Sequence, residues 1–462
     1  MASTHIIQRA SIDLQLPGIE QAEAGAVREW CVSVLLEELD VVLSEICPEH
    51  QMIVMPTLTL DLTLPVWNEL LRPDQKNVLR QQIRQQMAEQ TPAVRMPLDQ
   101  HRAEIVLRYL SEGSLDEMYA EPEWDELKAA FRQVSQQNRL FQQRLLRALM
   151  DESAFQRWLS LTDEAFRYVW LDTQLPESAG SWRDILTQLH DVLVFHWPEH
   201  PMSVRQMLQI LIRLMAQGIG EPKQLVRTVV ETEFPVEKVW TTTLVTAINQ
   251  RTSGPIAQWL VNVLSAATPW PGQTVASEST VSSDLAEASK PQSPPADQRV
   301  AVSAAGLVLV AHFLPAFLRA IGLVDADNKL INSWRIPMLL YFMATGETQA
   351  DEWQLVLPKI LCGLPIAESC DTSIDVSEGE QQEVNKLLTD VIEHWGRLKT
   401  TSPDGLRATF LQRAGRLTEK EAMFALAIPE ETVDILLSFI PWSFRYVRFS
   451  WMKKLLITEW GG

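Results

Sequence analysis

The stretch TSPDGLRATFLQRAGRLT (Thr401–Thr418) places a helix start, a helix with two arginines and a glycine turn close together. Ser402 suits an N-cap, and Pro403 suits the first helical position, where its fixed φ fits. Asp404 suits the positive end of the helix dipole. Gly405 would let another backbone segment approach closely. This part of the stretch therefore predicts a short helix with a defined start.

The following residues predict an apolar helix face. Leu406, Phe410 and Leu411 share one side of the expected helix. Arg407 and Arg413 are expected to lie outside that face. No base stands beside a nucleophile here, so we interpret the stretch as a structural or docking motif and not as a reactive loop.

Gly415 leads from this helix into a predicted β-hairpin. Residues 416–418 are expected to pair with residues 423–428 across a turn at 419–421. Helices are expected before this stretch, and an extended segment after residue 443. Together these elements predict a C-terminal α+β domain over residues 300–462.

The apolar run at residues 300–317 raises the question of a membrane span. It contains no formally charged side chain and reaches the length that a span needs. However, His312 and Pro315 interrupt it, and Arg319 follows at once. These interruptions favour a buried helix around residues 306–322.

The N-terminal residues alternate between apolar and polar side chains in two places. Residues 10–16 and 57–64 both show a period of two, which predicts two half-buried strands. A helix with an apolar stripe lies between them and ends before Pro48. Its paired carboxylates Glu37 and Glu38 are expected to face solvent. Residues 1–65 therefore predict a β-α-β module.

The middle of the chain divides into two segments of different composition. Residues 66–267 carry several short apolar stripes of helical period, one of them between an N-cap at Ser203 and a stop at Gly218. Residues 268–299 are rich in Pro, Ser, Ala and Glu, which predicts a flexible linker. The expected fold is α+β and mainly α-helical, with an N-terminal β-α-β unit, a central helical region and a C-terminal helical domain with a β-hairpin.

Composition and charge argue against several classes of protein. The 462 residues carry a net charge of −19, and the longest basic cluster is Lys453-Lys454, so nucleic acid is not an expected partner. The four cysteines form no CxxC pair, and the N-terminus lacks the features of a secretory signal. We therefore expect free thiols and synthesis in the cytoplasm.

The search for catalytic and metal-binding motifs yields no positive result. The two histidines of HWPEHP, at residues 196–201, have zinc spacing, but two prolines argue against a continuous helix there. His312 and His394 are single histidines that we interpret as packed core residues. No phosphate-binding, dinucleotide-binding or nucleophile-elbow motif is present. We expect no enzyme activity, no cofactor and no metal.

Two blocks of the sequence resemble a known family. The N-terminal block includes HIIQRASIDLQLP and CPEHQMIVMPTLTLDLTLP, and the C-terminal block runs from AGLVLVAHFLPAFLRAIGLV through LLYFMATGE, VLPKILCGLP and HWGRLKTTSPDGLRATFLQRAGRL to IPWSF and SWMKKLLITEW. Both are similar to the tape measure proteins of contractile injection systems, which are phage-tail-like particles. The blocks cover about half of the chain, and the middle is similar only in its helical character.

The resemblance implies a non-enzymatic structural role in controlling inner tube assembly or length. The implied partners are the inner tube and the baseplate or spike proteins, first in the cytoplasm and later within the particle. Membrane contact is implied only at firing. A baseplate or tube-initiating factor without a ruler function, and a loaded cargo protein or toxin, are the alternatives. The candidate docking or structural motif comprises Ser402, Pro403, Asp404, Gly405, Arg407, Phe410, Arg413, Gly415, Pro441 and Trp442.

Overall fold

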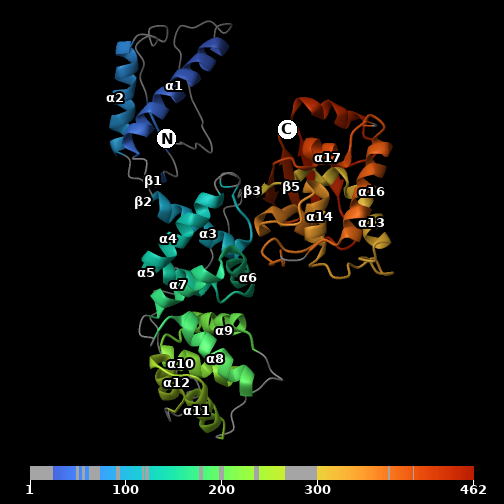
Figure 1. Ribbon diagram of the computed structural model, residues 1–462. Coiled ribbons are helices and arrows are strands. Elements are labelled where there is room, and N and C mark those ends of the chain that lie inside the picture. Colours follow the sequence, from blue (N-terminus) through green and yellow to red (C-terminus); the bar gives the residue numbers. More distant parts are fainter. Residues whose placement is uncertain are drawn as a thin grey trace. The chain divides into compact units, whose positions relative to one another are not determined.

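The computed structural model confirms a mainly helical α+β protein with two small sheets (Figure 1). The chain divides into two compact units, Met1–Glu104 and Ile105–Gly462, which we describe separately. The structure describes residues 24–47, 51–54, 58–61, 73–89, 94–116, 119, 124–175, 180–196, 202–233, 239–265, 299–372, 375–398 and 400–461.

The first unit is built on two helices, α1 (Ala24–Ile46) and α2 (Pro73–Glu89). Leucine, isoleucine, valine and methionine side chains from both helices form a small buried cluster. Glu38 is also fully buried and pairs with Lys76 and Arg80 of α2, so the expectation that it faces solvent is wrong. A carboxylate can be buried here because two cations meet it.

The small N-terminal sheet differs from the predicted one. Strand β1 (Gln51–Val54) pairs antiparallel with β2 (Val94–Pro97). The first predicted strand, at residues 10–16, lies outside the described residues. Within the second, Leu58–Asp61 is not a strand, although its two leucines pack on the helix cluster. The Asp61 backbone N–H donates to the Gln86 side chain at 2.7 Å. In a sheet, this N–H would instead donate to the backbone of a neighbouring strand.

The second unit begins at Ile105, within helix α3, and continues with a series of short helices. Leucines, valines and aromatic rings alternate with polar residues at helical spacing, so each helix has one buried face. Ser203 forms a capping box at the start of α9, and Gly218 follows its end with a positive φ, as expected. The helices are α3 (Leu98–Glu112), α4 (Trp124–Gln137), α5 (Arg139–Ala148), α6 (Glu152–Leu161), α7 (Glu164–Gln174), α8 (Trp182–His196), α9 (Val204–Ala216), α10 (Pro222–Glu233), α11 (Val239–Arg251) and α12 (Pro255–Ser265).

Tryptophans fill the interior of this helical region. Trp158, Trp170 and Trp182 are fully buried, and the first two rings meet edge to face with centroids 5.4 Å apart. Large aromatic rings bury much apolar surface and pack with specific geometry. The helical region therefore has a fixed interior of its own. Most of the predicted linker at residues 268–299 lies outside the described residues, and its last residue, Arg299, begins strand β3.

A five-stranded sheet forms one side of the C-terminal part. Its order is β3-β4-β5-β7-β6; β5 and β7 run parallel, and the other neighbours run antiparallel. The predicted hairpin is confirmed, because β4 and β5 pair directly. The strands are β3 (Arg299–Val302), β4 (Gly415–Glu419), β5 (Met423–Ile428), β6 (Tyr446–Val447) and β7 (Leu455–Trp460).

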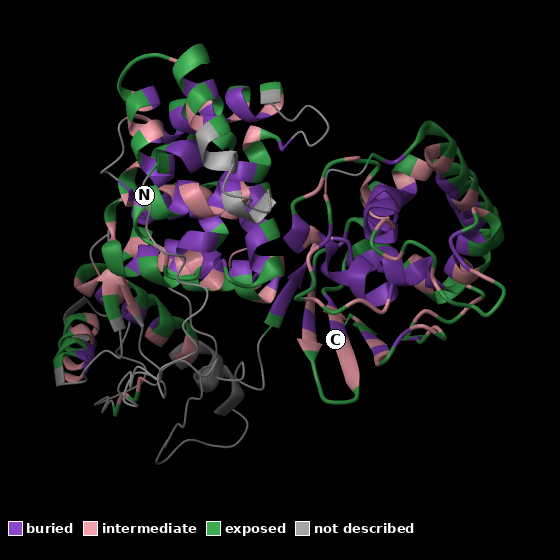
Figure 2. Cartoon of the chain, turned by 90° about the horizontal axis from the view of Figure 1, so that it is seen from below, coloured by how far each residue is buried: buried purple, intermediate pink, exposed green. Residues whose placement is uncertain are grey.

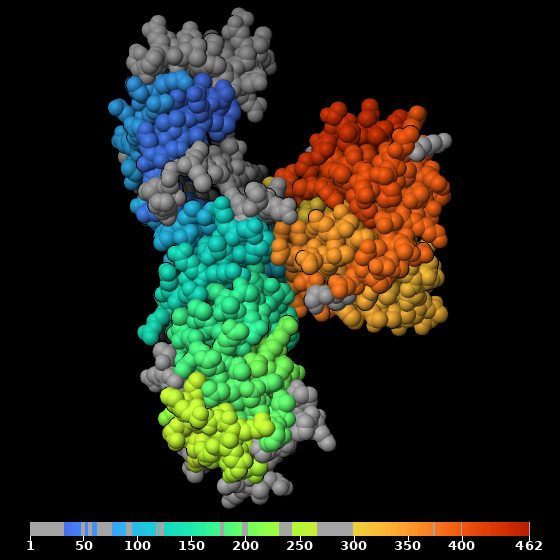
Figure 3. Space-filling model, in the orientation of Figure 1, coloured from blue at the N-terminus to red at the C-terminus, as the bar shows by residue number. Residues whose placement is uncertain are grey.

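Helices and turns cover this sheet and enclose a large apolar core (Figure 2). The C-terminal residues gather into one body, yellow-orange to red in Figure 3. The covering elements are the 3₁₀ helices Ala305–Leu309, Ala311–Phe313, Glu352–Leu355 and Thr432–Phe439, the helices α13 (Leu314–Ala320), α14 (Ile336–Thr345), α15 (Val356–Leu361), α16 (Glu378–Trp395) and α17 (Pro403–Leu406), and a π-helical turn at Arg407–Leu411.

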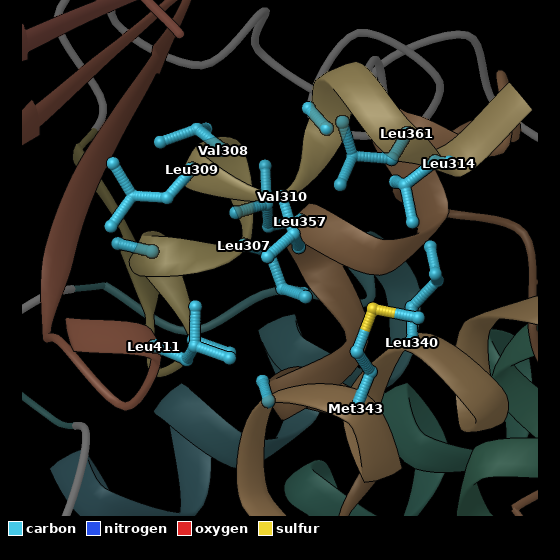
Figure 4. Packing of buried hydrophobic residues seen from close by; sticks show 14 of the residues in the cluster. Leu307, Val308, Leu309, Val310, Leu314, Leu340, Met343, Leu357, Leu361 and Leu411 are labelled. Atoms are coloured by element: carbon cyan, nitrogen blue, oxygen red, sulfur yellow. The ribbon is translucent and has the colours of Figure 1, made fainter. Parts of the chain in front are cut away.

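Most of the apolar run at residues 300–317 is buried, but it is not one helix. It supplies most of strand β3, two 3₁₀ helices and the start of α13. The 3₁₀ segment lies against α15, and Leu307, Val310 and Leu357 are close together in Figure 4. The pairing of β3 with β4 interrupts the helical conformation that the composition favours. Within the described part of the chain, no helix is both long and apolar enough to span a bilayer.

Candidate functional site

The predicted motif begins with the short helix α17. Ser402 is its N-cap, and the Ser402 hydroxyl accepts a hydrogen bond from the Gly405 N–H at 3.1 Å. Pro403 is its first residue. A Cβ on Gly405 would lie 2.9 Å from a Thr401 methyl group, and the atoms that it would meet belong to side chains. The prediction that another backbone segment approaches this glycine is therefore wrong. The absence of a side chain at Gly405 instead leaves space for the side chains of Thr401 and Ser402.

Arg407 lies inside the domain, with 4% of its surface exposed, so its expected place outside the apolar face is wrong. Its guanidinium donates to the Met343 carbonyl at 3.2 Å and to the Asn385 side chain at 2.8 Å. It also pairs with Asp404 at 2.7 Å and lies over the Phe342 ring. Arginine can be buried here because its planar group finds a partner in several directions.

Arg413 is likewise buried, at 5% exposure, which corrects the second arginine prediction. Its guanidinium meets the two carboxylate oxygens of Asp434 at 2.9 and 3.0 Å. It also donates to the Pro429 carbonyl at 2.6 Å and pairs with Glu431 at 3.1 Å. The guanidinium lies 5.5 Å from the Trp460 ring centroid. Arg413 therefore ties the hairpin to the 3₁₀ helix Thr432–Phe439.

Asp434 carries the negative charge of this second cluster. Burial raises the pKa of its carboxyl, but hydrogen bonds from Arg413, the Glu431 N–H and the Trp460 indole outweigh that effect. The pKa of Asp434 therefore lies below its ordinary value. The carboxylate stays charged at neutral pH and forms a bidentate ion pair with Arg413.

Phe410 and Gly415 fix how closely the backbone segments pack. Phe410 is buried, and its carbonyl oxygen lies so close to Gly306 that a Cβ there would be 1.8 Å away. Gly415 begins β4, and a Cβ on it would lie 2.7 Å from the Ala305 Cβ. Both contacts press the motif onto the 3₁₀ segment Ala305–Leu309. The close packing therefore requires glycine at both Gly306 and Gly415.

Trp442 and Pro441 complete the predicted set. The Trp442 indole N–H donates to the Leu309 carbonyl at 2.8 Å, and its ring meets Phe313 edge to face. Pro441 is exposed beside it. The structure thus buries Arg407, Phe410, Arg413 and Gly415, whereas Ser402, Asp404 and Pro441 are exposed. Arg407 and Arg413 lie in two clusters of different composition. His312 and His394 are exposed, and the expectation that they belong to the core is wrong.

A third cluster of buried charges was not predicted. Arg157 of α6, Glu352 and Lys359 are 1%, 3% and 0% exposed. One oxygen of Glu352 meets the Arg157 Nε at 3.1 Å and the Lys359 Nζ at 2.5 Å. Two cations share one carboxylate, so this buried cluster has a net positive charge. We refer to these three residues as the charge joint.

Backbone carbonyls provide the remaining partners of the charge joint. Arg157 donates to the carbonyls of Leu110 and Ala367, and Lys359 donates to that of Ile366 at 3.2 Å. Carbonyl dipoles of this kind help to satisfy the extra positive charge. The sequence held one signal: Arg157 is next to the buried Trp158, on the apolar face of α6.

The surroundings of the charge joint hold the helical region to the C-terminal domain. The Ala301 N–H of β3 donates to the Leu115 carbonyl at 2.9 Å. The rings of Trp124 and Trp353 meet edge to face, with centroids 6.4 Å apart. Burial also raises the pKa of the nearby Tyr109 well above its usual range. Backbone pairing, aromatic packing and buried charge therefore act together at this contact.

Comparison with known families identifies the chain. A family model described as contractile injection system tape measure protein matches residues 4–460, nearly the whole chain. No curated protein and no solved structure gives a significant match. Among the described residues, no group of three or more His, Cys, Asp or Glu side chains could hold a metal ion. The chain belongs to the tape measure protein family of contractile injection systems.

Proposed function

We propose that this chain controls the assembly or length of the inner tube while residues 105–462 remain folded. The family places it among the structural components of a contractile injection system. The proposed partners are subunits of the inner tube and of the baseplate or spike. The proposed location is the cytoplasm during assembly and the particle afterwards, and the role needs no catalysis.

The charge joint carries this proposal. Arg157 comes from the helical region, whereas Glu352 and Lys359 come from the C-terminal domain. Drawing the two parts out into one extended chain would separate three buried charges from their partners. Removing one partner of a buried pair costs about 3–5 kcal/mol. The tryptophan interior of the helical region would be exposed as well, which adds to the cost of extension.

The lengths of the helices also support action in the folded state. Helices α4 to α12 are between 10 and 15 residues long, which corresponds to about 15–22 Å each. Several of them begin with a side-chain N-cap, whose own backbone is extended and not helical. These caps keep consecutive helices from joining into one. A straight ruler helix would have to remove these caps and turns.

Particle assembly without the chain tests the proposed function. We expect that removing it leaves few complete particles or tubes of irregular length, and that the full-length chain supplied in trans restores them. Electron microscopy would count complete particles and measure tube length. A normal number of particles with normal, uniform tubes in the absence of the chain would contradict the proposal.

A further inference from the structure

Strand β6 forms an open edge of the C-terminal sheet. It pairs with β7 alone, with Tyr446 opposite Ile457. The Thr458 N–H donates to the Arg445 carbonyl at 2.8 Å. Alternate residues of an antiparallel pair turn their backbone groups to opposite sides, so the N–H and C=O of Tyr446 point away from β7. No hydrogen bond to these two groups occurs among the described residues.

Three exposed cations surround this edge. Arg445, Arg448 and Lys453 are exposed, and none forms an ion pair within the described part of the chain. Lys454, by contrast, meets a carboxylate of β4 at 2.9 Å. Residues 435–458 contain no aspartate or glutamate. The edge is thus a local positive surface on a chain whose net charge is −19.

Cations beside an edge strand discourage pairing with neutral or basic strands, which is a common protection against aggregation. They do not discourage pairing with an acidic strand. The Tyr446 side chain is 65% exposed on the same edge, and a large exposed ring is not a protective feature. Aromatic side chains next to arginine are instead enriched in binding surfaces.

We propose that the β6 edge surface, defined as residues 445–453, binds an extended acidic segment of a partner subunit. The segment would add a strand to the sheet beside β6. Its backbone would pair with the outward N–H and C=O of Tyr446, and its carboxylates would meet Arg445, Arg448 and Lys453. This inference rests on the proposed function, because the partners are subunits of the same particle.

Binding of a short peptide of alternating threonine and glutamate to the full-length chain tests the surface directly. We expect the charge reversal Arg445→Glu with Arg448→Glu to weaken binding at least about fivefold, because attraction becomes repulsion at two exposed sites. The control variant Arg139→Glu with Lys223→Glu makes the same change in net charge at exposed cations of α5 and α10. It should bind as the wild-type chain does. Binding should also weaken at about 0.5 M salt.

The variant Tyr446→Pro tests strand addition separately from charge. It removes the outward N–H and leaves the hydrogen bond from Thr458 to Arg445 in place, so it should fold and bind weakly. Equal binding by the wild-type chain and both edge variants would overturn the inference. Binding to phosphatidylserine vesicles with no binding to the peptide would overturn it as well.

Zero-length carbodiimide cross-linking in assembled particles tests the partner. We expect Lys453 to become linked to an aspartate or glutamate of a tube, baseplate or spike subunit, and this link to be lost in the charge-reversal variant. Normal assembly and an unlinked Lys453 would overturn the inference and leave the proposed function standing. If particles assembled equally well with and without the wild-type chain, the proposed function would be contradicted instead.

Discussion

Replacing Glu352 by glutamine would remove the only negative charge of the charge joint and keep its shape. Arg157 and Lys359 would then face a neutral amide, at 1% and 0% exposure. The carbonyls that accept hydrogen bonds from them would remain, but the shared carboxylate would not. Breaking a buried ion pair in this way costs about 3–5 kcal/mol, a large part of the 5–15 kcal/mol that stabilises a typical domain.

The assay is urea unfolding at neutral pH, followed by tryptophan fluorescence. The variant should lose about 3–5 kcal/mol of unfolding free energy. Glu393→Gln is the matched control, because it makes the same substitution at an exposed position of α16, and it should change the unfolding free energy by less than about 0.5 kcal/mol.

A third variant separates the loss of charge from the loss of packing. Replacing all three residues of the charge joint by leucine or methionine removes every charge, so we expect it to be more stable than Glu352→Gln alone. If Glu352→Gln unfolded within about 0.5 kcal/mol of the wild-type chain, no uncompensated charge would be buried there. The reasoning about the joint would then be refuted.

Three further predictions concern the C-terminal domain. Gly306→Ala should lose about 3 kcal/mol or more in denaturant unfolding, because its Cβ would overlap a backbone carbonyl, whereas Gly379→Ala, which meets no neighbouring atom in its helix, should be neutral or stabilising. The thiols of Cys362 and Cys370 should resist alkylation until the chain unfolds, since burial raises both pKa values, that of Cys370 to about 11; labelling of the native chain as fast as of the unfolded chain would contradict this. The pKa of Asp434 is lowered on folding, so this carboxylate should stabilise the folded chain above the ordinary carboxyl pKa of about 3.9. That stabilisation should be lost as the pH falls through the folded-state pKa. In acid unfolding, Asp434→Asn should make the unfolding free energy depend less on pH in this range.

Local sequence signals predicted several elements well. The cap at Ser402 needs only the three residues that follow it, and the hairpin of β4 and β5 needs only a turn and two alternating segments. Helix α9 lies between its own capping residue and a glycine, so its limits are also local. In each case the residues that determine the structure are close together in the sequence.

Contacts between distant segments explain the errors. Arg407 was expected outside the core because its partners, Met343 and Asn385, are 64 and 22 residues away. Arg157 and Glu352 are 195 residues apart, so neither residue gives any local sign of the other. A charged side chain is buried only where its partners are assembled, and the sequence pattern of one helix does not contain that information.

The most direct test of action in the folded state is inner tube length after a helical insertion between α9 and α10. Gly218 and Gly220 lie in the turn between these helices, and a Cβ at either position would meet no neighbouring atom. An insertion there of about 28 charged, helix-forming residues would span about 40 Å as a straight helix. We predict that electron microscopy will show tubes of unchanged length. Tubes that lengthen by about 40 Å, and by about 80 Å for a doubled insertion, would show that the chain measures in an extended state and would contradict the account.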